Sequence, residues 1–147
     1  MTITVLLVGD HHIVRDKLQT LLRRHPDLEL ISRPDAHAAT RLLGRRKVDV
    51  IVLDSHLPAI NGIKTADAMT SGADGPPVIL LSLHTDARYV KASFGSGVAG
   101  YLLRESASEE LPEAIRVVVE GNCYLSPPSA EAMPDGFVND SCRLKEK

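Results

Sequence analysis

Short apolar runs that alternate with amphipathic stretches constrain the fold of this chain more than any other feature. The runs are apolar at consecutive positions, and several are rich in β-branched residues. Strands of this kind are typical of a parallel sheet that is covered by helices on both faces. The sequence therefore predicts an α/β fold. The predicted strands are residues 3–8, 28–31, 48–53, 78–81 and 100–103.

The stretches between these runs carry apolar residues at helical spacing. Leu111, Ile115 and Val118, for example, fall at i, i+4 and i+7, which places them on one helix face. The last helix should begin at Ser106, because Ser106 and Glu109 have the spacing of a capping box. Helices are expected in 14–25, 35–44, around 66–69, around 86–94 and in 106–121. Five strands thus alternate with five helices.

Composition excludes several classes of protein. A net charge of −2 excludes a chain that binds nucleic acid mainly by neutralising phosphates. No apolar run reaches the ~20 residues that span a bilayer, and the chain start lacks the basic segment of a secretory signal. Cys123 and Cys142 form neither a CxxC pair nor a disulfide framework, which suits a reducing compartment. We therefore expect a cytoplasmic protein with no membrane partner.

The pattern changes near the end of the chain. Ser126-Pro127-Pro128 interrupts regular structure, and the residues that follow are mixed and polar. The sequence predicts one domain over residues 1–125 and a linker or tail over residues 126–147.

Polar residues stand directly at the ends of four predicted strands, namely Asp10, Asp54, Ser82 and Arg104. Open α/β sheets bind ligands at the carboxyl ends of their strands, where the strand order reverses. If the strand order is 2-1-3-4-5, Asp10 and Asp54 face one pocket. Two carboxylates in one pocket suit Mg²⁺. A hydroxyl and a guanidinium beside them would complete a phosphoryl-binding set.

Five segments resemble the receiver domains of bacterial response regulators, with the character of the NarL/FixJ (LuxR-tailed) subgroup. Together they cover about residues 2–128, and their order along the chain makes the resemblance specific. It implies a flavodoxin-like (βα)5 doubly wound parallel sheet with strand order 2-1-3-4-5. The segments are VLLVGDHHIVR (5–15), DVIVLDSHLPAING (49–62), LLSLHTD (80–86), GVAGYLLRES (97–106) and YLSP (124–127), the last being similar to the end of the family's last helix.

The resemblance implies a role for each matching residue in a two-component system. Asp54 would accept a phosphoryl group from the phosphohistidine of a sensor histidine kinase, as a signalling domain and not as an enzyme. Asp10, Asp54 and the backbone carbonyl of His56 would hold Mg²⁺. Ser82 would bind a phosphoryl oxygen, and Tyr101 would rotate inward as Ser82 shifts. Arg104 stands where the family has a lysine that contacts the phosphoryl group.

The resemblance also implies partners. Its subgroup joins the receiver to a helix-turn-helix output domain through a linker like residues 126–147, and this chain contains no such motif. We therefore expect DNA binding to belong to an output domain absent from this chain. A homodimer is expected through the face made by the fourth helix, fifth strand and fifth helix.

Two departures from the family pattern keep a second hypothesis open. Gly9 replaces an acidic residue, and we expect water to occupy the space that it leaves. Arg104 could pair with Asp10 or Asp54 and so mimic a bound cation in the resting state. The alternative is a degenerate receiver that acts as a phosphorylation-independent dimerisation module. A phosphatase would need an Asp where His56 stands, and a flavin protein would need a hydroxyl-rich phosphate loop after the first strand, so both are disfavoured.

Overall fold

The computed structural model describes residues 2–9, 12–54, 76–83, 87–95 and 97–127. In these ranges, six strands form one sheet in the order β2-β1-β3-β4-β5-β6, and all neighbouring strands are parallel. The predicted order 2-1-3-4-5 is therefore confirmed, with one strand added. The strands are β1 (Ile3–Val8), β2 (Leu28–Arg33), β3 (Val50–Asp54), β4 (Val78–Ser82), β5 (Gly100–Leu103) and β6 (Tyr124–Leu125).

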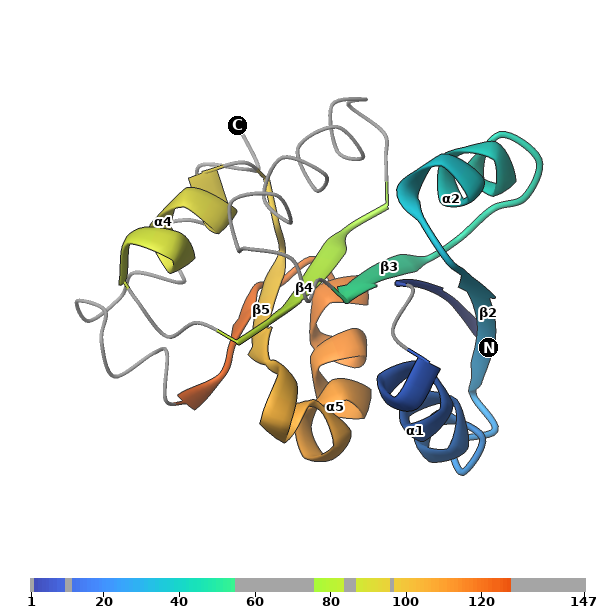
Figure 1. The fold of residues 1–147 in the computed structure, drawn as a ribbon, viewed down its shortest axis with the longest axis horizontal. Coiled ribbons are helices and arrows are strands. Elements are labelled where there is room, and N and C mark those ends of the chain that lie inside the picture. Colours follow the sequence, from blue (N-terminus) through green and yellow to red (C-terminus); the bar gives the residue numbers. More distant parts are fainter. Residues whose placement is uncertain (1, 10–11, 55–75, 84–86, 96, 128–147) are drawn as a thin grey trace.

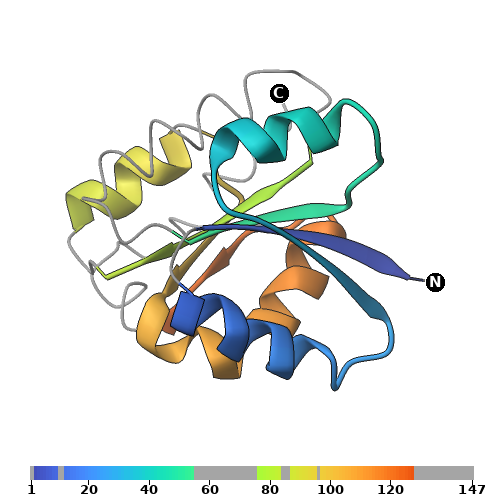
Figure 2. The same ribbon diagram turned by 45° about the vertical axis from the view of Figure 1, so that its right-hand side comes forward.

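Helices cover both faces of the sheet. Figure 2 shows α1 and α5 below it and α2 and α4 above it, and Figure 1 gives the same division from another direction. This arrangement confirms the doubly wound α/β fold. The helix predicted around residues 66–69 lies outside the described residues. The described helices are α1 (His12–Leu22), α2 (Ala36–Leu43), α4 (Ala87–Gly95), the short 3₁₀ helix η1 (Arg104–Ser106) and α5 (Ala107–Val119).

Alternate residues of each strand supply two separate cores. In β3, all five residues are buried; Val50 and Val52 pack toward α1 and α5, whereas Ile51 and Leu53 pack toward α2 and α4. This explains why the strands are apolar at consecutive positions, because neither face meets water.

Two predicted helix ends are confirmed and one is wrong. Asp35 caps α2, since its carboxylate accepts a hydrogen bond from the backbone N–H of Ala38 at 2.8 Å. Gly121 follows α5 with a φ of +97°, the left-handed conformation that favours glycine. The capping box of Ser106 and Glu109 does not form. The Ser106 hydroxyl makes no cap hydrogen bond and contacts Glu110 instead, at 2.6 Å.

The residues after α5 form a sixth strand, which the sequence analysis missed. The family resemblance places Tyr124-Leu125-Ser126-Pro127 at the end of the last helix, but β6 pairs with β5 on the side away from β4. The Ser126 N–H donates to the Tyr101 carbonyl at 2.9 Å, and Ser126 is fully buried. Ser126, the first residue of the predicted linker or tail, is therefore bound to β5.

The structure also bears on the expectations about membrane spans and cysteines. Among the described residues, no helix has the length and apolar character needed to cross a bilayer. The expectation that the cysteines form no disulfide does not hold for Cys123, which is disulfide-bonded.

Candidate functional site

The strand register brings three of the predicted site residues to one edge of the sheet. Val8 lies beside Leu53, so Gly9 follows next to Asp54. Ser82 at the end of β4 lies beside Leu103, and Arg104 is the next residue. These positions are at the carboxyl ends of adjacent strands, where open α/β sheets bind ligands.

Asp54 and Arg104 form an ion pair that is nearly closed to solvent. The guanidinium donates to Asp54 Oδ1 from Nε at 2.9 Å and from an NH2 nitrogen at 2.6 Å. The side chains are only 3% and 12% exposed, respectively. Of the two partners considered for Arg104, the structure therefore places Asp54 beside it. The pair puts a fixed positive charge against the predicted phosphoacceptor.

The second carboxylate oxygen of Asp54 faces Gly9. A Cβ atom added to Gly9 would lie 3.6 Å from Asp54 Oδ2 and 3.1 Å from both the Cβ and the backbone oxygen of Asp54. The backbone at Gly9 is thus closely packed against β3, and the expected water-filled space is not found directly beside it. Within the described residues, Oδ2 accepts no hydrogen bond, so it is the oxygen that a ligand of Asp54 would use.

Ser82 and Tyr101 lie on neighbouring strands and contact each other. The Tyr101 hydroxyl donates to Ser82 Oγ at 3.0 Å, and both residues are buried, Tyr101 completely. Tyr101 packs among the apolar residues between the sheet and α2 and α4. In this structure Tyr101 thus already occupies the inward position to which we expected it to rotate.

The remaining predicted metal ligands lie outside the described residues. These are Asp10 and His56. Among the residues that the structure does describe, no three His, Cys, Asp or Glu side chains cluster in a way that could hold a metal ion. Of the predicted set, only Asp54 can be placed.

Sequence reasoning missed a polar network next to this site, centred on Glu110. Its carboxylate accepts hydrogen bonds from the hydroxyls of Ser106 at 2.6 Å, Tyr124 at 2.7 Å and Ser126 at 3.0 Å. Burial and the Glu110 hydrogen bond raise the pKa of the Tyr124 phenol well above its usual range. The signal in the sequence was the pair of hydroxyl residues in Tyr124-Leu125-Ser126, which a parallel strand beside β5 would turn toward the start of α5.

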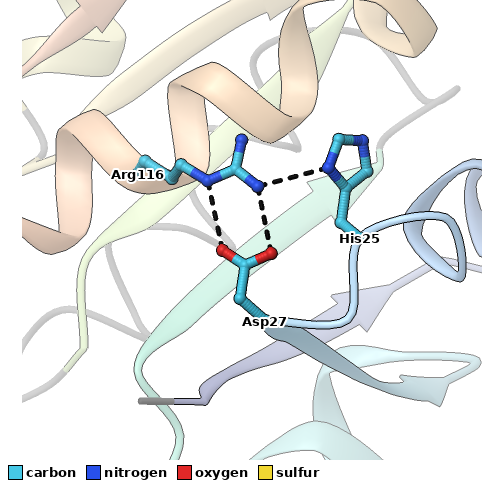
Figure 3. A network of polar contacts seen from close by, with 3 residues as sticks. All are labelled: His25, Asp27 and Arg116. Atoms are coloured by element: carbon cyan, nitrogen blue, oxygen red, sulfur yellow. Dashed lines mark hydrogen bonds and ion pairs between the residues drawn. The ribbon is translucent and has the colours of Figure 1, made fainter.

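A second polar network lies away from the site. In Figure 3, Arg116 on α5 reaches toward the segment between α1 and β2. It donates to both carboxylate oxygens of Asp27, at 3.1 and 3.2 Å, and contacts His25 Nδ1 at 3.2 Å. These hydrogen bonds hold the pKa of Asp27 below its usual range. Because the segment precedes β2, the network lies at the amino ends of the strands, opposite Asp54.

Comparisons with known proteins identify the family of this chain. Residues 5–116 match the family model of the response regulator receiver domain. The transcriptional regulatory protein UhpA of Escherichia coli (strain K12) is 32% identical over 135 residues, which are 91% of this chain and 67% of UhpA. The transcriptional regulatory protein DegU of Brevibacillus brevis is 30% identical over 126 residues, which are 85% of this chain and 53% of DegU. The chain thus spans between half and two thirds of these relatives.

Solved structures give the same result. A LuxR-family two-component response regulator from Aurantimonas sp. SI85-9A1 superposes with a TM-score of 0.80 at 28% identity, over 90% of this chain and 95% of the other. The isolated REC domain of RcsB from Salmonella enterica serovar Typhimurium has a TM-score of 0.78 at 20% identity, over 99% of this chain and 100% of the other. The RcsB match supports the fold alone.

Proposed function

Because the chain belongs to the receiver domains of two-component response regulators, we propose that it accepts a phosphoryl group on Asp54 from a sensor histidine kinase. The observation that supports this most directly is the environment of Asp54. This carboxylate ends a fully buried strand, has a cation against one oxygen and has no hydrogen bond from the described residues on the other. A carboxylate so placed is fixed in position and partly neutralised.

The phosphoryl transfer would form a P–O bond to Asp54 as the P–N bond of phosphohistidine breaks. Asp54 Oδ2 is the oxygen suited to attack, since Arg104 occupies Oδ1. The transition state spreads charge over the equatorial oxygens of the phosphoryl group. Arg104 would stabilise that charge, and the hydroxyl of Ser82 would donate to a phosphoryl oxygen after leaving its contact with Tyr101.

Mg²⁺ is the cofactor that this site suits. Its ligands would be Asp54, Asp10 and the backbone carbonyl of His56, which together offer the hard oxygen atoms that Mg²⁺ prefers. When bound, the ion supplies positive charge to the transferring phosphoryl group. Arg104, which contacts Asp54 Oδ1, is the residue of the protein that would supply positive charge as well.

Phosphorylation would control a transcriptional output in the cytoplasm. The relatives UhpA and DegU are transcriptional regulators and are longer than this chain. We therefore assign DNA binding to an output domain that residues 126–147 would join to the receiver. The phosphorylated form would dimerise through α4, α5 and the sheet edge between them.

The first test combines the protein with Mg²⁺ and acetyl phosphate, a small phosphodonor. Mass spectrometry should show the addition of one phosphoryl group, and peptide mapping should place it on residue 54. The modification should be absent in Asp54→Asn, which keeps the shape of the side chain. An unmodified wild-type protein at millimolar Mg²⁺ would contradict the proposal and favour the phosphorylation-independent dimerisation module.

A further inference from the structure

Glu110 joins the start of α5 and the 3₁₀ helix directly before it to the strand that follows α5. Ser106 belongs to η1, Glu110 to the first turn of α5, and Tyr124 and Ser126 to β6 and the residue that follows it. Each hydroxyl carries one hydrogen, and the short contacts of Ser106 and Tyr124 with the carboxylate assign their hydrogens to Glu110. We call Glu110 and these three hydroxyl residues the Glu110 hub.

Ser126 connects the hub to the strand that leads into the phosphoacceptor site. Its hydroxyl donates to Glu110 and accepts a hydrogen bond from the Leu103 N–H at 3.1 Å. Its own N–H donates to the Tyr101 carbonyl at 2.9 Å. Ser126 is thus bonded to β5 on either side of Leu102, and it is fully buried.

The residue after Leu103 is Arg104, which holds Asp54. On its amino side, the Leu103 N–H donates to the Ser126 hydroxyl. On its carboxyl side, the side chain of Ser106, two residues further on, donates to Glu110. A planar guanidinium that donates twice to one oxygen tolerates little displacement of its backbone. The position of Arg104 at Asp54 and the position of β6 therefore depend on the same few hydrogen bonds.

We propose that Glu110 is a positioning residue for Arg104, and that through the same hub the occupancy of the Asp54 site is transmitted to β6, where the chain leaves the domain. The use of this coupling in signalling rests on the proposed function, since phosphorylation of Asp54 would move Arg104 from the carboxylate to the phosphoryl group. The coupling itself is a property of the resting protein. By linkage it acts in both directions.

The decisive experiment uses no phosphodonor, so its result is independent of whether Asp54 is phosphorylated. Amide hydrogen exchange is measured by NMR in the wild-type chain and in Arg104→Gln. We expect the amides of Leu103 and Ser126 to exchange about fivefold faster in the variant, as the loss of roughly 1 kcal/mol of hydrogen bonding would give. The amides of Leu6 and Val52 report global unfolding and should change less.

The matched control is Arg116→Gln, which removes an arginine ion pair from the opposite edge of the domain. It should leave the Leu103 and Ser126 amides unchanged relative to Leu6 and Val52. An equal acceleration at all four amides in Arg104→Gln, or no acceleration at any of them, would overturn the proposal.

The reverse direction is measured at Arg104 itself. The hydrogen-bonded Nε–H of Arg104 should give a protected NMR signal that is lost or exchanges several-fold faster in Glu110→Gln, because an amide places donors where the hub needs acceptors. Glu113→Gln is the control, since Glu113 is an exposed glutamate on the same helix. Tyr124→Phe should give a smaller change of the same sign. An Arg104 signal that is the same in Glu110→Gln and Glu113→Gln would refute the positioning role, whatever the phosphorylation test shows.

Discussion

Arg104 and Asp54 each need the charge of the other, because both side chains are nearly closed to water. Removing one partner of such a pair leaves a buried charge without compensation, which costs about 3–5 kcal/mol. We therefore expect Arg104→Ala to lower the free energy of unfolding at pH 7 by about 3 kcal/mol, measured by urea denaturation. Arg104→Lys, which keeps the charge, should cost less.

The double variant Arg104→Ala/Asp54→Asn is the control for this pair. With no buried charge left, it should recover most of the stability that Arg104→Ala loses. If the double variant is no more stable than Arg104→Ala, the loss comes from packing of the arginine and not from the ion pair.

The ion pair of Arg116 and Asp27 should give stability that depends on pH. The hydrogen bonds from Arg116 lower the pKa of Asp27 from its ordinary value of 3.8. A carboxyl with a lowered pKa in the folded state stabilises the protein above its unfolded pKa, and that stability is lost as the pH falls through the folded value. Arg116→Gln should therefore be less stable than wild type at pH 7, and the difference should shrink as the pH falls below 3.8 and vanish once the pH lies below the folded pKa of Asp27.

Urea denaturation across this pH range measures the effect. Arg23→Gln removes the same charge from an exposed side chain and should show no such pH dependence. A difference between Arg116→Gln and wild type that persists undiminished in acid would contradict the assignment to Asp27.

At the scale of the elements, β6 is what completes the edge of the sheet beside Tyr101. Two hydrogen bonds join Ser126 to β5, and a third joins Tyr124 to Ala99, the residue before β5. A further two reach Glu110. We predict that a chain ending at Leu125 is less stable than one ending at Pro127 by about 2–3 kcal/mol, since it loses the buried bonds of Ser126. Equal urea midpoints for the two chains would place the domain end at the earlier residue.

The elements also show what the sequence could and could not predict. Runs such as Val50–Leu53 are buried on both faces, and this burial leaves a direct apolar pattern in the sequence. β6 leaves no such pattern, because two residues are too few for a period and its hydrogen bonds are mostly to the backbone of β5. Spacing alone predicts a capping box between Ser106 and Glu109. In the folded chain the Ser106 hydroxyl donates to Glu110 instead, which also accepts hydrogen bonds from two other hydroxyls.

The sequence could predict those site residues that stand directly at the carboxyl ends of strands. Asp54, Ser82 and Arg104 follow from the strand order and the rule that ligands bind at carboxyl ends. The choice of Asp54 over Asp10 as the partner of Arg104 required the registers of β3 with β4 and of β4 with β5, which the sequence pattern does not contain. The close approach of Gly9 to Asp54 likewise depends on how tightly β1 and β3 pack at their ends.

For the whole molecule, β6 changes the face through which a dimer is proposed. In the predicted five-stranded sheet, β5 would be the edge strand. In the structure β6 lies beyond it, so β6 forms the edge between α4 and α5. α4 exposes Lys91, and α5 exposes Glu109 and Glu113. In a dimer with two-fold symmetry, each α4 could meet the α5 of the partner, and opposite charges would then face each other twice.

We therefore predict that charge reversal on α4 weakens the dimer formed with Mg²⁺ and beryllofluoride, a mimic of the phosphoryl group. Lys91→Glu should raise the dissociation constant at least about tenfold, since the two-fold axis doubles each lost attraction. Lys17→Glu makes the same charge change on an exposed position of α1 and should have a smaller effect. Sedimentation equilibrium measures both constants. If Lys17→Glu weakens the dimer as much as Lys91→Glu or more, the interface does not lie on the α4–β6–α5 face.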